Sequence, residues 1–180
     1  MINDRCLSSQ VRQFFHPQVL SQSGILQTSH CYLAAAVSHL FLAHSAAELI
    51  CLCHFYPEWC RVPGQSAFAT IGLDANDVCL RHLANCFPNA KVHTVFGNDL
   101  AGRVWDCKIS LWQNGLDADF RLACAQVRVK WAEREFFFPA EGFTLNRFFK
   151  RIGKFQTNPA LKPRGGYRNF TEKFCACHPL

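Results

Sequence analysis

The chain has 180 residues, 49% of them hydrophobic, which is enough to bury the core of a single domain. Its formal charge is uneven: residues 1–118 carry a net −1 (seven Lys or Arg, eight Asp or Glu), and residues 119–180 a net +7 (twelve and five). No N-terminal stretch resembles a signal peptide and no apolar run is long enough to span a bilayer, so we expect a cytoplasmic protein without a membrane partner.

The first strand–helix unit follows a weakly patterned lead-in at residues 1–37. The apolar run of residues 38–43 predicts a core strand. Ser45, followed three residues later by Glu48, has the pattern of a capping box, so we expect a helix to begin there and to end before Pro57. This helix is apolar on nearly all sides, as expected of a helix that covers a sheet.

Two further strand–helix units come next. Residues 67–71 predict a second strand that ends at Gly72, and the helix after it stops at Pro88. Residues 91–96 predict a third strand, and a polar turn leads from it into a helix that ends near Gln113. Three such units in succession predict an α/β fold with a parallel sheet and right-handed crossovers. In such a sheet, functional groups gather at the carboxyl ends of the strands.

The hydrophobic period changes in the last third of the chain. Short strands are expected at residues 119–123, 126–131 and 135–138, and Thr144 predicts the start of a last helix that ends at Gly153. The tail is basic and interrupted by Pro and Gly, which predicts an irregular segment. The expected organisation is a lead-in at 1–37, an α/β domain at 38–125, a strand–helix extension at 126–155 and a basic tail at 156–180.

The most distinctive motif is the run Phe-Gly-Asn-Asp-Leu-Ala-Gly-Arg from Phe96 to Arg103. It is similar to the Asp-Asn-Asp-x-Ala-Gly-Arg stretch of the Toprim family, and Thr70-Ile71-Gly72 is similar to that family's glycine turn. Over residues 38–125 the chain resembles the Toprim-like proteins of bacterial mobile elements, which are related to primases and topoisomerases. The resemblance implies a three-layer α/β domain with a mainly parallel four-stranded sheet, and a role in DNA replication or mobilisation.

The resemblance also implies a Mg²⁺ site, from which this sequence departs. In the family, a Glu after the first strand is the general acid or base, and two Asp residues after the third strand bind the metal. Here His44 stands in place of the Glu and Gly97 in place of the first Asp, so that Asp99 remains as metal ligand. Glycine offers no side-chain ligand and imidazole is a poor one for Mg²⁺, so we expect any Mg²⁺ binding to be weak.

Several residues are candidates to complete such a site. Glu48 lies one turn beyond His44 and is a candidate to face the same crevice, with helix capping as the alternative. His44 is a candidate general base, with a structural hydrogen bond as the alternative. Asp74 and Asp77 follow the second strand, and capping roles explain both. Asp99 also has helix capping as its alternative.

The basic last third of the chain predicts an anionic partner, with nucleic acid as the first candidate and a solvated surface as the alternative. The candidate phosphate contacts are Arg103, Arg147, Lys150, Arg151, Lys154, Lys162, Arg164 and Arg168. Tyr167 and Phe170 are candidates to stack on bases, as is Phe155, whereas Phe148 and Phe149 are expected to pack in the core.

Three functions therefore compete. The first is a catalytically degenerate Toprim-like protein that binds nucleic acid, and we favour it. The second is an active Mg²⁺-dependent nuclease or primase-type enzyme that uses Asp99, Glu48 and His44. The third is a protein-interaction scaffold without a nucleic-acid role.

The cysteines fit a reducing compartment. The chain has 11 Cys and no paired C-x-x-C of zinc-ribbon spacing. Several lie in apolar helical patterns, where Cys acts as a small hydrophobe: Cys51, Cys53, Cys79, Cys86 and Cys107. The run from Cys175 to His178 is a weak metal-binding pattern, for which an unstructured chain end is the alternative.

Overall fold

The structure, a computed structural model, describes residues 6–15, 18, 24–28, 33–62, 64–72, 75–154 and 159–179. The strands are β1 (Gly24–Ile25), β2 (His39–Ala43), β3 (Ser66–Thr70), β4 (Lys91–Thr94), β5 (Asp119–Ala123), β6 (Gln126–Trp131) and β7 (Arg134–Pro139). The helices are α1 (Ser9–Phe14), α2 (Ala46–Phe55), the 3₁₀ helix η3 (Pro57–Cys60), α3 (Asp77–Cys86), α4 (Leu100–Gln113), α5 (Leu145–Ile152) and α6 (Phe170–Cys177).

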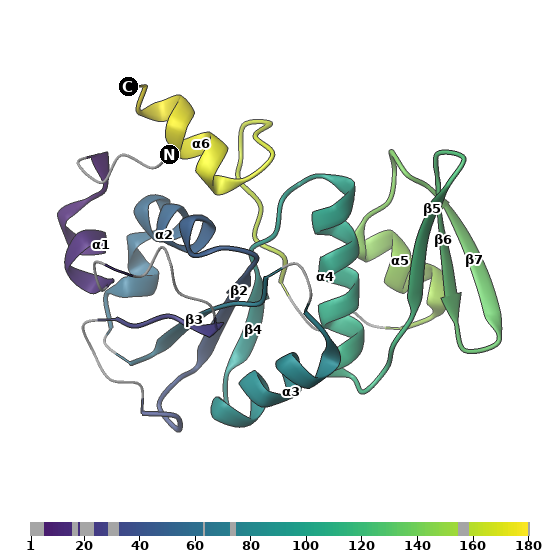
Figure 1. The fold of residues 1–180 in the computed structure, drawn as a ribbon, viewed down its shortest axis with the longest axis horizontal. Coiled ribbons are helices and arrows are strands. Elements are labelled where there is room, and N and C mark those ends of the chain that lie inside the picture. Colours follow the sequence, from purple (N-terminus) through teal and green to yellow (C-terminus); the bar gives the residue numbers. More distant parts are fainter. Residues whose placement is uncertain are drawn as a thin grey trace.

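The larger sheet has four strands in the order β1–β3–β2–β4 (Figure 1). The central strand β2 pairs in parallel with both β3 and β4, and β1 adds an antiparallel edge to β3. All residues of β3 are buried, as are all but the first residue of β2 and of β4, as expected of parallel strands that are covered on both faces. The expected α/β fold with a mainly parallel four-stranded sheet is confirmed.

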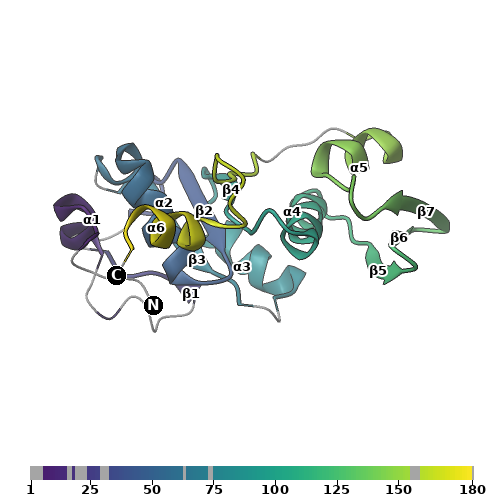
Figure 2. The ribbon, with the colours of Figure 1, turned by 90° about the horizontal axis from the view of Figure 1, so that it is seen from above.

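Helices cover both faces of this sheet. One face carries Phe41 and Phe68 and packs against α1, α2 and α6. The other carries Leu40 and Leu42 and packs against α3 and α4. Because successive side chains of a strand point to opposite faces, a single apolar run supplies both cores. Figure 2 shows the strands between α2 and α6 on one side and α3 and α4 on the other.

The helix α4 belongs to two hydrophobic cores. Its Ile109 and Trp112 pack with the larger sheet and α3, whereas Cys107 and Leu111 pack with α5 and a second, antiparallel sheet of order β5–β6–β7. Both views place this second sheet beyond α4 (Figures 1 and 2). Since β5 pairs with β6, the second unit begins at Asp119, before the boundary expected at residues 125 and 126.

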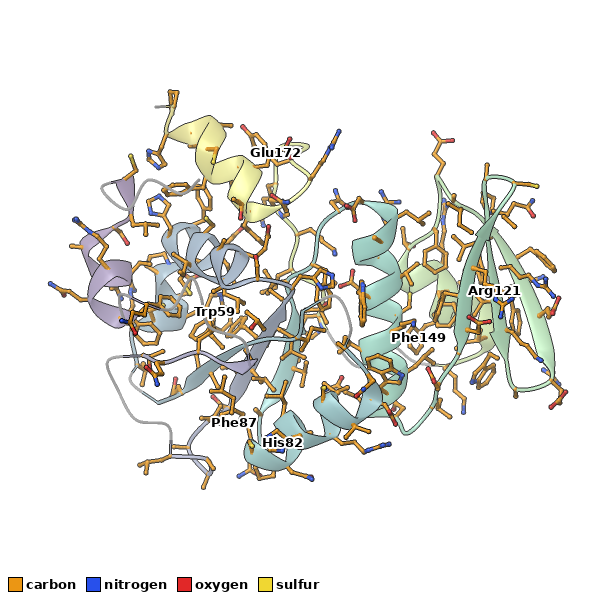
Figure 3. The ribbon with its side chains drawn as sticks, viewed as in Figure 1. Trp59, His82, Phe87, Arg121, Phe149 and Glu172 are labelled. Atoms are coloured by element: carbon orange, nitrogen blue, oxygen red, sulfur yellow. The ribbon has the colours of Figure 1, made fainter. Side chains whose placement is uncertain are left out.

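The second sheet and α5 have the amphipathic patterns that the sequence predicts. Along β6, Val127 and Val129 are buried while Arg128 is exposed. The α5 helix buries its apolar residues, and Thr144 caps it by accepting a hydrogen bond from the backbone of Arg147 at 3.2 Å. Figure 3 shows Phe149 of α5 between α4 and the second sheet. Phe148 and Phe149 are core residues, as expected.

The tail does not remain irregular, and this expectation was wrong. After α5 the chain returns to the larger sheet, where Ala160 pairs in parallel with Thr94. The Thr94 amide donates to Pro159 O at 3.1 Å, and the Leu161 amide donates to Thr94 O at 2.8 Å. This short edge places the following residues at the carboxyl end of β4.

The tail ends in the helix α6, which the sequence analysis missed. Asn169 caps it by accepting from the Glu172 amide at 2.7 Å, and its Phe170 and Phe174 are buried in the core formed with α2. Phe170 is therefore a core residue, and the prediction that it stacks on bases was wrong. The other candidate, Phe155, lies outside the described residues.

The cysteines differ in their exposure to solvent. Cys51, Cys53 and Cys107 are buried, as expected, but Cys79 is exposed on α3. Burial raises the pKa of Cys51 to about 12, and it also raises the pKa of Cys53 and of Cys107, so these groups stay as thiols. In the described part of the chain, no helix combines the length and the apolar character needed to cross a membrane.

Candidate functional site

The carboxyl ends of the parallel strands bring three predicted positions to one edge of the sheet. His44 follows β2, Gly72 follows β3, and Gly97 follows β4. His44 Nδ1 lies 2.7 Å from Gly72 O, and because a carbonyl only accepts, this nitrogen carries the proton. The imidazole also packs against Phe96 at 4.5 Å and Trp105 at 5.3 Å between ring centroids. The prediction that His44 and the Gly97 turn share an edge is confirmed.

The turn after β4 is built on a close approach between two glycines. A Cβ atom on Gly102 would overlap the carbonyl group of Gly97, so α4 packs its first turn directly on this loop. Asp99 is exposed and caps α4 by accepting a hydrogen bond from the Gly102 amide at 2.8 Å. The capping role considered for Asp99 is therefore present, and its carboxylate is used to hold the helix start.

Arg103 holds the same turn from the other side. Its guanidinium donates to Asn98 O at 2.8 and 3.1 Å, to Glu141 O at 3.3 Å and to Phe143 O at 3.2 Å. The last two carbonyls belong to the loop between β7 and α5. Arg103 thus ties the second sheet to the edge of the first, which gives this arginine a structural role besides the predicted phosphate contact.

A lysine ammonium occupies the edge beside β4. Lys162 Nζ donates to Phe96 O and Gly97 O, both at 2.9 Å, and forms an ion pair with Asp106 Oδ2 at 2.7 Å. The side chain of Lys162 is 22% exposed and that of Asp106 is 2% exposed. Burial raises the pKa of Asp106, and the charge of Lys162 opposes this rise. The edge thus carries its own cation, bound by three oxygen atoms.

Asp106 is the site residue that the sequence analysis missed. The available signal was a carboxylate at a buried position of α4, next to Trp105 and Cys107. A buried carboxylate requires a partner. The partner, Lys162, was itself predicted to contact phosphate, and in the structure its charge is directed at Asp106 instead.

Glu48 is bound to α6. Its Oε2 accepts from the Phe170 amide at 3.2 Å and its Oε1 accepts from the Thr171 hydroxyl at 3.1 Å. The helix α2 begins after Ser45, as expected, but the Ser45 side chain makes no capping hydrogen bond. The prediction of a capping box was therefore wrong. Burial raises the pKa of Glu48, and the hydrogen bonds from α6 and the charge of Lys162 oppose the rise.

Each carboxylate near this edge thus has a different partner: Asp99 binds the start of α4, Glu48 binds the start of α6, and Asp106 pairs with Lys162. Among the residues that the structure describes, no three His, Cys, Asp or Glu side chains come together so that they could hold a metal ion. Asp77 pairs with Arg81 on α3, and Asp74 lies outside the described residues. Mg²⁺ prefers carboxylate oxygens as protein ligands, and among the described residues the carboxylates of Asp99, Glu48 and Asp106 already have other partners.

The remaining candidate phosphate contacts lie on two surfaces. One is the solvent side of α5 and the turn after it, with the exposed residues Arg147, Lys150, Arg151 and Lys154. The other is the loop before α6, where Arg164 and Arg168 are exposed and Tyr167 is half-buried. This loop is held at the sheet edge because the Asn98 amide donates to Arg168 O.

Comparison of the chain with protein families, with curated proteins and with solved structures finds no match.

Proposed function

We propose that this chain is a Toprim-like protein that binds nucleic acid through its basic C-terminal third and has lost metal-dependent catalysis. The family assignment rests on the run from Phe96 to Arg103 and on its place between a buried parallel strand and a helix. A role in the replication or mobilisation of DNA belongs to the same proposal.

The observation that carries the proposal is the solvent side of α5. Lys150, Arg151 and Lys154 are exposed, and in the described part of the chain no carboxylate forms an ion pair with any of them. The opposite side of α5 is buried, so Lys150 and Arg151 are presented by a fixed helix, and Lys154 lies in the turn that follows it. Cations that are neither paired nor buried are the groups that release counterions from a phosphate backbone.

The sheet edge supports the loss of catalysis. At this edge a lysine ammonium is bound by Asp106 and two backbone carbonyls, and His44 and Gly97 replace residues that the resemblance assigns to the reaction. A fixed ammonium neutralises the buried carboxylate without a metal ion. It also adds positive charge where a second cation would be repelled.

The test of the proposal is a salt titration of binding to a fluorescent oligonucleotide. We expect the logarithm of the affinity to fall with the logarithm of salt concentration by about 0.9 per contact on duplex and about 0.7 on single strands. The double variant Lys150→Glu, Arg151→Glu should weaken binding and flatten the slope. The matched control, Arg12→Glu with Arg61→Glu, reverses two exposed cations outside the C-terminal third and should leave binding unchanged. Absence of binding at low salt would favour the scaffold function.

The enzyme alternative is tested by calorimetry. Titration of the wild-type protein with Mg²⁺ should give no sub-millimolar binding, and such binding would favour a nuclease or primase-type activity. Gly97→Asp together with His44→Glu should create it, because a side chain at residue 97 would begin 3.3 Å from Asp99 Oδ1.

A further inference from the structure

A groove of about 440 Å³ lies between the end of α2, η3 and the returning tail beside β4. Its volume is within the usual range of sites for small organic ligands. The groove is lined by the aromatic residues Tyr56, Trp59 and Phe170 and by the charged residues Glu58, Lys162 and Arg164. Its Tyr56, Glu58 and Trp59 lie outside the basic C-terminal third on which the proposed function rests, whereas Lys162 and Arg164 belong to that third.

Trp59 is the fixed aromatic wall of this groove. Its ring contacts Phe41 at 4.9 Å, His39 at 5.0 Å and His93 at 5.6 Å between ring centroids. Burial and the neighbouring His39 and Lys91 lower the pKa of His93 to about 4, so this support is uncharged at neutral pH. Figure 3 shows Trp59 between α2 and the strands. A ring that is held on one side and lines a groove on the other is prepared for stacking.

The charged residues of the groove restrict what can stack there. The ammonium of Lys162 is paired with Asp106, whereas the exposed guanidinium of Arg164 has no hydrogen-bond or ion-pair partner among the described residues. A free guanidinium matches the geometry of a phosphate. The exposed carboxylate of Glu58 accepts hydrogen bonds from hydroxyl or amino groups and repels a second phosphate.

We propose that this groove binds one nucleotide unit, with its base on Trp59 and Tyr56, its phosphate on Arg164, and a ribose hydroxyl or base amino group donating to Glu58. Together these side chains select a ligand that has an aromatic ring, a single phosphate and hydrogen-bond donors. The inference rests on the proposed function, which it deepens: the unit is either part of a bound single strand or a free nucleotide of the same chemistry.

The experiment measures the anisotropy of a fluorescent oligoadenylate, whose units carry both a ribose hydroxyl and a base amino group, and its competition by adenosine 5′-monophosphate. Trp59→Ala should weaken binding roughly tenfold to a hundredfold, the range of a lost base stack, and Trp59→Phe should retain most of it. Arg164→Gln changes an exposed side chain, so it leaves the fold intact and should also weaken binding. Arg61→Gln, at an exposed arginine just after η3, is the matched control and should have no effect.

The two proposals fail in different ways. If Lys150→Glu with Arg151→Glu weakens binding but Trp59→Ala and Arg164→Gln do not, the nucleotide groove is overturned and the proposed function stands. If the oligonucleotide does not bind but calorimetry detects binding of adenosine 5′-monophosphate that depends on Trp59 and Arg164, the groove takes free nucleotides and the proposed function falls. Binding of neither probe overturns both.

Discussion

At the scale of single residues, the ion pair of Lys162 with Asp106 is the interaction on which the sheet edge depends most. Lys162→Met leaves the buried carboxylate of Asp106 without its cation, and we expect a loss of about 3–5 kcal/mol in the free energy of unfolding. Urea titration measures it. Adding Asp106→Asn to Lys162→Met should recover much of the loss, because no buried charge then remains. A double variant no more stable than Lys162→Met would contradict this account.

The same variant has a defined pH dependence. Burial raises the pKa of Asp106 in the folded protein, and without Lys162 this pKa rises further. At a pH between the pKa of Asp106 in the unfolded chain and its higher pKa in the folded protein, the folded state binds more protons than the unfolded state. The free energy of unfolding therefore falls as the pH rises through this window. The difference in stability between wild type and Lys162→Met should therefore be small in acid and grow toward neutral pH.

Gly102 is a second residue whose identity the edge requires. In Gly102→Ala the new methyl group overlaps the Gly97 carbonyl, and backbone atoms on both sides must move. We expect a loss of about 1–3 kcal/mol, the usual range for overpacking, measured by urea titration. Gly142→Ala is the matched control, because its methyl group meets only the end of the flexible Arg147 side chain. Equal losses in the two variants would argue against a rigid contact at Gly102.

At the scale of elements, α6 is held to α2 by Glu48 and by two buried phenylalanines, Phe170 and Phe174. Glu48→Gln keeps the shape of the side chain but removes the negative charge from the start of α6. We expect a loss of about 1 kcal/mol, as for other helix caps, and faster hydrogen exchange of the α6 amides. Glu133→Gln, in the exposed turn between β6 and β7, should change neither quantity. Unchanged exchange in Glu48→Gln would show that the phenylalanines alone hold the helix.

Elements that local patterns define were predictable, and elements that depend on distant partners were not. The apolar runs of β2, β3 and β4 and the cap of α5 at Thr144 involve neighbouring residues, so the sequence predicts them. The partner of Glu48 lies 122 residues away, at Phe170. The short α6 sequence gave no helical signal strong enough to outweigh the Pro and Gly before it, since its stability comes from docking on α2.

Some features of the candidate site were also predictable from the sequence, and others were not. That His44, Gly72 and Gly97 meet at one edge follows from parallel strands, because their carboxyl ends lie together. The role of Lys162 was not predictable. Its contact with Phe96 O spans 66 residues and depends on the tail returning beside β4. The predicted contacts of the α5 cations and Tyr167 with nucleic acid stay predictions.

At the scale of the whole molecule, α4 joins the two sheets into one structure. Its residues are buried on the side of the larger sheet and also on the side of α5, and Arg103 connects the start of α4 to the loop before α5. A helix that completes two cores transmits the loss of one to the other, so we expect the described parts to unfold together.

Phe148→Ala tests this coupling. Phe148 is fully buried against Phe120, Phe138 and Phe143 in the core of the second sheet. Its truncation should lower the free energy of unfolding by about 3–5 kcal/mol. Native-state hydrogen exchange should then show the same reduction in protection for the amides of β2 and β4 as for those of β6. Phe137→Ala, an identical change at a side chain that is 57% exposed on β7, is the control and should leave both unchanged. Reduced protection confined to β5, β6 and β7 would mean that the two cores open independently in spite of the helix they share.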